Sequence, residues 1–448
     1  MNILNQKIET NFESFLEDLK TLISIPSVYE EDNSPYPFGK NIDDALKSML
    51  SIAQKIGFTT YYDPEGYYGY ADYGTGSETI GILGHLDVVP AGDLKEWHTN
   101  PFEVSIVDGK IYGRGVQDDK GPTLAAMYGV KAVIDSGVSI NKKIRFIFGT
   151  DEERLWECIK KYNEKEQIPD YGFTPDANFP LIYAEKGLLQ IDLIADNESS
   201  LCFKGGDAYN SVPSNITIED DHLSEIATEL IALNFDFKQE DQKLTVFGKS
   251  FHAKDAEKGT NAITRLLMAM KNAGLSSKSI EFITKYINED ALAINIFGPC
   301  SDEMSGKLKF NVGKIELNEK EEKLFIDMRI PVSVTKEFVM EKLEKVTSEF
   351  GFKIRENDYL RSIYTPLDSK LVKSLMSAYQ EVTGDLESQP ISSGGATYAR
   401  AIDNCVAFCM TFPHSKETEH QPNEYATVED MKNATKIYAN AIAKLNQF

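Results

Sequence analysis

The sequence predicts an α/β fold in which a discontinuous domain is interrupted by an inserted α+β domain. Two observations support this prediction. Short apolar runs alternate with helical patterns near both ends of the chain, and the pattern between them changes. Strands that alternate with helices are typical of a largely parallel sheet with flanking helices. We therefore expect a first domain part at 1–186, an inserted domain at 187–367 and a second part at 368–448.

Helices and buried strands alternate in the first segment. Apolar residues at helical spacing predict helices at 8–23 and 42–56, and a third helix at 122–135. The apolar runs 80–84 and 144–148 are short and uninterrupted, as expected of strands that are buried on both faces. These elements are expected to build the parallel part of the sheet.

The middle of the chain has a different pattern. Strands are predicted at 188–195, 243–249 and 324–330, and helices at 262–273 and 335–350, without regular alternation. After the middle segment the sequence returns to α/β character, with predicted helices at 369–383 and 428–446. One domain built from both ends of the chain is the simplest arrangement that fits.

Composition restricts the class of protein and of partner. The chain has 448 residues, 42% of them hydrophobic, and a formal net charge of −23, so we expect a folded protein that repels nucleic acid and anionic membrane surfaces. Its five cysteines are scattered and form no Cys-x-x-Cys pair, which favours a reducing cytoplasm. We expect no signal peptide, and no apolar run reaches the roughly 18 residues that a membrane span needs.

Histidine and acidic side chains follow the predicted strands. His85 and Asp87 come directly after 80–84 and lie two residues apart, so in extended backbone they point the same way. Asp87 is placed to orient the imidazole of His85, as carboxylates commonly do for metal-binding histidines. A structural His–Asp pair would look the same. Asp118 and Asp119 form a second acidic group beside a glycine-rich turn, where a cation or a helix N-terminus would stabilise them.

Three further candidates complete the set. Glu152 and Glu153 follow the strand at 144–148, and such a pair suits one metal ligand and one general base. Asp176 and His420 lie in proline-containing loops, where a lone residue of either type is usually structural. Ligands that offer only nitrogen and oxygen suit zinc, manganese or cobalt.

These segments together resemble the aminoacylase/carnosinase family of two-metal peptidases, and within it the bacterial peptidase V-type (Xaa-His dipeptidase-like) enzymes. The resemblance extends from Ile25-Pro-Ser-Val28 to the segment His420–Tyr425, nearly the whole chain, and rests on five ordered motifs. It implies a zinc-peptidase-like catalytic domain with the inserted domain as a lid.

The resemblance also implies the role of each candidate. His85 and Asp176 would hold one metal ion, Glu153 and His420 the other, and Asp118 would bridge both. Glu152 would be the general base that activates a metal-bridging water. Asp87 and Glu424 would support the ligands, and the peptide bond between Asp118 and Asp119 is expected to be cis.

In the lid, the resemblance implies substrate-binding and catalytic roles. His252, in the motif that starts at Phe251, would stabilise the tetrahedral oxyanion, although a structural role at a helix start is the alternative. Asn210 would help to orient the substrate or the intermediate, and Arg329 would hold the substrate carboxylate, as an arginine fork can. The loop with Gly394 and Gly395 could offer backbone amides to the same carboxylate.

The implied activity is metal-dependent hydrolysis of short peptides, chiefly dipeptides with a free C-terminal carboxylate. Two divalent ions per chain are expected, with zinc first and manganese or cobalt as alternatives. An amidase that acts on N-acyl amino acids, such as a deacylase or desuccinylase, would have the same ligands and stays open. An inactive, ligand-binding relative would be expected to lack a ligand or the base. The length of the insert predicts a monomer whose lid supplies His252 within the same chain.

Overall fold

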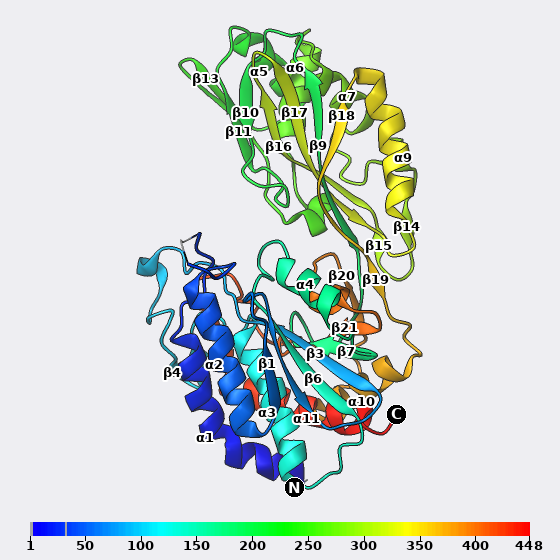
Figure 1. The fold of residues 1–448 in the computed structure, drawn as a ribbon. Coiled ribbons are helices and arrows are strands. Elements are labelled where there is room, and N and C mark those ends of the chain that lie inside the picture. Colours follow the sequence, from blue (N-terminus) through cyan, green and yellow to red (C-terminus); the bar gives the residue numbers. More distant parts are fainter. Residues whose placement is uncertain (1–2, 32–33) are drawn as a thin grey trace. The chain divides into compact units, whose positions relative to one another are not determined.

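The computed structural model describes residues 3–31 and 34–448 and divides the chain into two compact units (Figure 1). The first unit comprises the chain up to Tyr183, with Thr365–Ile391 and Thr397–Phe448. The second comprises Ala184–Tyr364 and Ser392–Ala396. The predicted boundaries, 186/187 and 367/368, lie three residues beyond 183/184 and 364/365, and the short return of 392–396 to the second unit was not predicted.

A mixed sheet organises the first unit. Its order is β1-β2-β6-β3-β7-β21-β8-β19, with β20 also paired to β8. Strand β19 and the last two residues of β8 and of β20 belong to the second unit. The four strands β6, β3, β7 and β21 run parallel, and the outer pairs are antiparallel. The strands are β1 (Thr59–Tyr62), β2 (Gly69–Tyr73), β3 (Thr79–His85), β6 (Lys143–Gly149), β7 (Tyr171–Thr174), β8 (Ile182–Glu185), β19 (Ile363–Tyr364), β20 (Ile391–Ser393) and β21 (Cys405–Ala407). The predicted α/β fold is confirmed, with the parallel pairing confined to the centre of the sheet.

Helices cover this sheet. Helix α3 is buried along most of its length and contacts both α1 and α11, and α11 also contacts α10. The lack of a side chain at Gly129 allows α3 and α11 to lie this close, because a Cβ there would be 2.9 Å from the backbone nitrogen of Ala439. The helices are α1 (Ile3–Ile23), α2 (Lys40–Ile56), α3 (Lys120–Asp135), α4 (Glu157–Lys165), α10 (Lys370–Thr383) and α11 (Val428–Leu445). A small sheet of β4 (Ser105–Val107), β5 (Lys110–Tyr112) and β22 (Tyr425–Thr427) completes the unit.

The second unit contains an antiparallel five-stranded sheet of order β10-β16-β17-β9-β18. Apolar residues of these strands and of α5, α6, α7 and α9 form one buried core. The elements are β9 (Gly187–Asp196), β10 (Phe203–Gly205), β16 (Lys309–Leu317), β17 (Glu321–Ile330), β18 (Lys353–Leu360), α5 (Leu223–Ala232), α6 (Ala262–Asn272), α7 (Lys278–Tyr286), α8 (Ile294–Phe297) and α9 (Lys336–Thr347), with a three-stranded sheet of β11 (Asn215–Ile218), β12 (Phe237–Glu240) and β13 (Lys243–Phe247) and a hairpin of β14 (Ser301–Asp302) and β15 (Gly306–Lys307).

The opposite face of the five-stranded sheet carries polar side chains. Asn311, Asp327 and Gln190 are direct cross-strand partners on β16, β17 and β9, so their side chains share this face. Arg329 lies two residues after Asp327 on β17, so its side chain points to the same face of the sheet. In the described part of the chain, no helix has both the length and the apolar character to cross a membrane.

Candidate metal centre

The candidate ligands of the first unit lie where parallel strands end. His85 is the last residue of β3, and the neighbouring strands β6 and β7 lead into the loops of Glu153 and Asp176. Parallel strands place their carboxyl ends at one edge of the sheet, where open α/β sheets form their sites. Asp118 lies directly before α3, and His420 lies in the loop before β22.

The structure brings these five side chains together. Nε2 of His85 is 2.9 Å from Oδ1 of Asp118, and Nε2 of His420 is 2.9 Å from Oδ2 of the same carboxylate. Nε2 of His420 is also 3.1 Å from Oε1 of Glu153. One atom each from His85, Asp118 and Asp176 lie within 4.8 Å of one another, as do atoms of Asp118, Glu153 and His420. Asp118 therefore belongs to both groups.

The backbone around Asp118 is shaped for this placement. The Asp118–Asp119 peptide bond is cis, as the resemblance implied. Asp119 is directed the other way and accepts hydrogen bonds from the backbone N–H of His85 (3.1 Å) and the hydroxyl of Thr123 (2.8 Å). A Cβ at Gly84 would lie 1.8 Å from Oγ1 of Thr123, so only glycine allows β3 to lie this close to α3.

Neighbouring groups orient the ligands. Nδ1 of His85 lies 3.0 Å from the backbone carbonyl of Asp87, which can accept its proton, and Nε2 is the ring nitrogen that faces Asp118. The carboxylate of Asp87 accepts the backbone N–H of Glu153 at 3.0 Å. Asp87 therefore contacts two candidate ligands, one from each group.

Glu424 holds the loop of Asp118. Its Oε1 accepts backbone N–H groups from Gly115 (3.0 Å), Gln117 (2.8 Å) and Asp118 (3.2 Å). Its Oε2 accepts Nη1 of Arg114 at 2.6 Å, and both side chains of this ion pair are buried. The loop is thereby tied to a residue more than 300 positions later in the chain.

The electrostatics of the cluster favour a bound cation. Burial, and then the charge of Asp118, raises the pKa of Asp176 well above its usual range. Burial raises the pKa of Glu152 in the same way, with further contributions from Asp176 and Glu153. For His420 burial opposes the charged form, but hydrogen bonds to Asp118 and Glu153 outweigh it and raise the pKa to about 11. Carboxylates crowded like this need positive charge nearby, and the nitrogen and oxygen donors fit divalent metal ions.

Glu152 lies in the turn after β6, half-buried beside Glu153. The indole N–H of Trp156 donates to the backbone carbonyl of Glu152 at 2.7 Å. The Trp156 ring packs edge-on against Tyr398, which in turn packs edge-on against His85. This aromatic support was not predicted, because a tryptophan four residues after a glutamate has no distinctive sequence signal.

The second unit holds the remaining predicted residues. The segments of Asn210 and His252 pair, since the N–H of Ala253 donates to the carbonyl of Asn210 at 2.8 Å. Nδ1 of His252 accepts the backbone N–H of Lys254 at 3.1 Å, so in the neutral ring the proton is on Nε2. Desolvation, and then the positive charges of Arg329 and Lys254, lowers the pKa of His252 to about 4. His252 is therefore a neutral hydrogen-bond donor near pH 7.

Arg329 is buried and already partly engaged. Its Nε and Nη2 donate to the two carboxylate oxygens of Asp327 (2.7 and 3.1 Å), and its Nη1 donates to the carbonyl of Gly394 (2.8 Å). Two of its five N–H groups are left for another acceptor. The backbone N–H of Gly395 donates to the hydroxyl of Ser393 at 2.9 Å. Asp327 was missed by sequence reasoning, although its position two residues before Arg329 on a strand was a usable signal.

Histidine and carboxylate side chains gathered at the strand ends of an α/β fold are a donor set that the class of metal-dependent hydrolases uses. Within that class, the chain belongs to the peptidase family M20/M25/M40, whose sequence profile matches residues 81–444, and it is a metallopeptidase. The resemblance to two-metal peptidases is thereby confirmed at the level of the family.

Curated relatives match over almost their full length. The chain is 35% identical to "Putative dipeptidase" of Staphylococcus epidermidis, with 96% of each chain covered. It is 33% identical to "Putative dipeptidase YtjP" of Bacillus subtilis, with 97% of each chain covered.

Solved structures share the fold at low identity. The dipeptidase Dug1p of Saccharomyces cerevisiae has a TM-score of 0.62 at 16% identity and covers 100% of this chain and 98% of its own. Human carnosine dipeptidase 1 has a TM-score of 0.59 at 18% identity, with 99% and 98% covered.

Proposed function

We propose that this metallopeptidase hydrolyses short peptides, chiefly dipeptides with a free C-terminal carboxylate. The observation that carries the proposal is the carboxylate of Asp118, which lies 2.9 Å from a histidine on each side. A shared carboxylate between two ligand groups suits a pair of metal ions. The names of the curated relatives support dipeptides as the substrate class.

His85 and Asp176 would hold one ion, Glu153 and His420 the second, and Asp118 both. When bound, the two ions would supply positive charge that lowers the pKa of the attacking water and stabilises the transition state. Zinc is the ion we propose first, since the donors are imidazole and carboxylate, and manganese or cobalt would also fit.

The side chains of the protein carry the proton and hold the substrate. Glu152 takes a proton from the attacking water and delivers it to the leaving amine as the peptide C–N bond breaks. His252 donates its Nε2 proton in a hydrogen bond to the oxyanion, and Asn210 orients the same group. Arg329 binds the C-terminal carboxylate through its two remaining N–H groups, with the Gly394–Gly395 loop holding the guanidinium.

We also propose that the enzyme acts in the cytoplasm as a monomer. No disulfide joins any two of the five cysteines, which all lie in the described part of the chain, as is usual in a reducing compartment.

Removal of metal tests the proposed function. EDTA should abolish hydrolysis of a dipeptide panel, and added Zn²⁺, Mn²⁺ or Co²⁺ should restore it. N-acyl and N-succinyl amino acids in the same assay should be cleaved more slowly than dipeptides. Full activity of a chelated sample shown to be metal-free would overturn the mechanism, and preferred cleavage of the acyl compounds would reassign the substrate class.

A further inference from the structure

The segments of Asn210 and His252 form one structural unit. The N–H of Ala253 donates to the carbonyl of Asn210, and the N–H of Val212 donates to the carbonyl of Phe251, both at 2.8 Å. These bonds flank the antiparallel bridge between Ser211 and His252. A displacement of the Asn210 segment is therefore transmitted to His252.

A buried asparagine on β16 fixes the backbone on both sides of Asn210. Nδ2 of Asn311 donates to the carbonyl of Tyr209 at 2.8 Å and to the carbonyl of Ser211 at 2.9 Å. Both amide hydrogens are used in these two bonds, and the side chain is only 2% exposed. The polar face of the five-stranded sheet thus holds the Asn210 segment through Asn311.

The backbone of β16 is adapted to this contact. A Cβ at Gly313 would lie 2.4 Å from the carbonyl oxygen of Ala208 and 2.5 Å from that of Tyr209. The strand register shifts between Val312 and Lys314, which makes room for the approach. The hydroxyl of Tyr209 adds a third anchor, since it donates to Asp192 at 2.6 Å.

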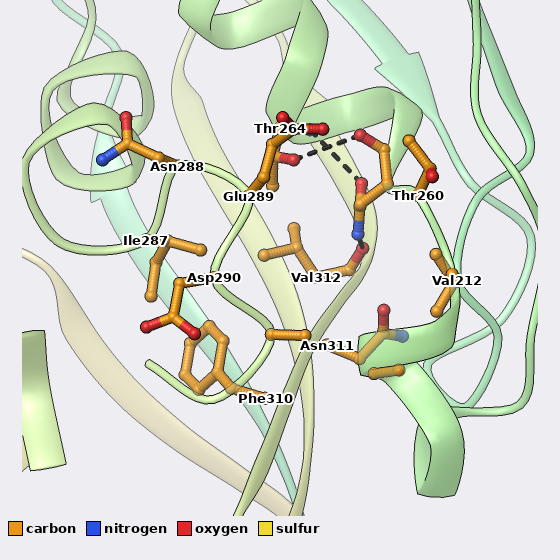
Figure 2. Close-up of a pocket in the computed structure, with 14 residues that line it drawn as sticks. Val212, Thr260, Thr264, Ile287, Asn288, Glu289, Asp290, Phe310, Asn311 and Val312 are labelled. Atoms are coloured by element: carbon orange, nitrogen blue, oxygen red, sulfur yellow. Dashed lines mark hydrogen bonds between the residues drawn. The ribbon is translucent and has the colours of Figure 1, made fainter. Parts of the chain in front are cut away.

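Packing alone does not hold the amide of Asn311. Asn311, Val212 and Thr260 line a cavity in the second unit (Figure 2). Oδ1 of Asn311 is buried and has no hydrogen-bond partner in the described part of the chain. Because the side chain borders this cavity, its orientation depends on the two hydrogen bonds that it donates.

We propose that Asn311 is a positioning residue for the hydrolysis, which acts through Asn210 and His252 without touching the substrate. This inference rests on the proposed function and deepens it. Both residues would act on the oxyanion, which exists only during the reaction. Loss of Asn311 therefore lowers kcat and leaves KM nearly unchanged.

The first test is kinetic. Asn311→Leu keeps a similar volume but removes both donors, and kcat should fall about 10- to 100-fold with KM within about threefold, because small misplacements of catalytic groups have effects of this size. Asn261→Ser is the matched control. Asn261 lines the same cavity, donates to the carbonyl of Val312 at 2.8 Å and caps α6 through Oδ1. Serine can keep the cap, removes the donor to Val312 and adds no charge, so kcat should stay within about twofold.

A double-variant comparison separates positioning from general damage. In a His252→Ala background, Asn311→Leu should lower the remaining kcat by less than about threefold, because residues that act through one another are not additive. The full 10- to 100-fold loss in that background would show that Asn311 acts independently of His252, and the proposal would be wrong.

Hydrogen exchange of the ligand-free protein gives a readout that does not need activity. The amides of Ala253 and Val212 should exchange at least about tenfold faster in Asn311→Leu than in the wild type, with the β16–β17 amides unchanged. If Asn311→Leu does not fold, Gly313→Ala is the substitute variant, because its Cβ would press on the carbonyl groups of Ala208 and Tyr209. It should show the same faster exchange at Ala253 and Val212. Unchanged exchange and kcat, or loss of protection throughout the sheet, would overturn the inference. A wild type that cleaves no dipeptide while these amides respond would instead contradict the proposed function alone.

Discussion

Glu152 and Glu153 are adjacent in the chain but lie in different surroundings. Oε1 of Glu153 is 3.1 Å from Nε2 of His420, and its backbone is tied to Asp87. Glu152 has a pKa raised by burial and by neighbouring carboxylates, among them Asp176. Burial raises the pKa of both carboxyls, so the contact with His420 is what separates their roles. Glu153 suits the role of ligand, and Glu152, which with its raised pKa accepts a proton readily, suits that of base.

Replacement of the base should separate proton transfer from metal binding. Glu152→Gln should lower kcat by about 10²- to 10⁴-fold, because an amide cannot accept the proton of the attacking water. Both metal ions should remain, as measured by elemental analysis, whereas the control Glu153→Gln should lose metal. A near-normal kcat in Glu152→Gln would assign the base to another residue.

The proposed contact between the guanidinium of Arg329 and the C-terminal carboxylate of the substrate can be tested by removing the charge of that carboxylate. A C-terminally amidated dipeptide should be cleaved at least about tenfold more slowly at low concentration than the free acid, because it lacks the charge that a charge-assisted hydrogen bond needs. The ratio of kcat/KM for the two substrates measures this effect. In Arg329→Lys the difference between the substrates should shrink, and equal rates in the wild type would show that the carboxylate is bound elsewhere.

Residue types and motif order were enough to predict the cluster of His85, Asp118 and their partners. Sequence could not supply contacts that depend on strand register. Asn311 became recognisable only as the cross-strand partner of Asp327. The predicted use of backbone amides in the Gly394–Gly395 loop stays a prediction, and the structure adds that Gly394 accepts from Arg329 through its carbonyl.

At the scale of elements, the candidate site depends on segments far apart in sequence. The strands β6, β3 and β7 place three ligands at one sheet edge, and Glu424 joins the loop before α3 to the segment before β22. The buried pair of Arg114 and Glu424 is one of several connections between these two segments. An ion pair in this position is costly to break, because the remaining charge stays buried.

Glu424→Gln should therefore destabilise the protein by about 3–5 kcal/mol, measured by urea unfolding, and weaken metal binding. The matched control is Glu164→Gln, which removes a carboxylate from an exposed pair with Lys161 on α4. Such surface pairs contribute about 0–1 kcal/mol. Equal, small effects of the two substitutions would show that the loop of Asp118 is held by other contacts.

Helices were easier to predict than the direction of strands. The apolar spacing at 8–23, 42–56 and 122–135 corresponds to α1, α2 and α3 within a few residues, except that α1 begins earlier, at Ile3. The antiparallel edges of the main sheet were not predicted, because pairing partners such as β2 and β6 are far apart in sequence. Local patterns identify a strand but do not determine its neighbours.

At the scale of the whole molecule, the residues that we propose for metal binding and those for substrate binding belong to different units. The candidate metal ligands belong to the first unit, and His252, Asn210 and Arg329 belong to the second. We propose that one chain supplies both sets, with the second unit acting as a lid that excludes water during turnover.

A mixture of two impaired variants tests whether the sets act within one chain. His252→Ala and Glu152→Gln should each have a strongly reduced kcat, and an equimolar mixture should show no more than the average residual activity of the two if the active unit is a monomer. Mass measurement in solution is the companion experiment and should give a mass near 50.2 kDa. Recovered activity in the mixture would mean that His252 of one chain serves the metal centre of another.

Glu424 accepts hydrogen bonds from Gly115, Gln117 and Asp118, so the Asp118 loop can take its final form only after Glu424 has been synthesised. A ribosome has made most of the polypeptide before His420 and Glu424 emerge, so the nascent chain lacks both a candidate ligand and the acceptor that holds the Asp118 loop. Hydrolytic competence is therefore expected only once the segment before β22 has been made. Truncated products of interrupted translation would be unable to cleave peptides in the cell that made them.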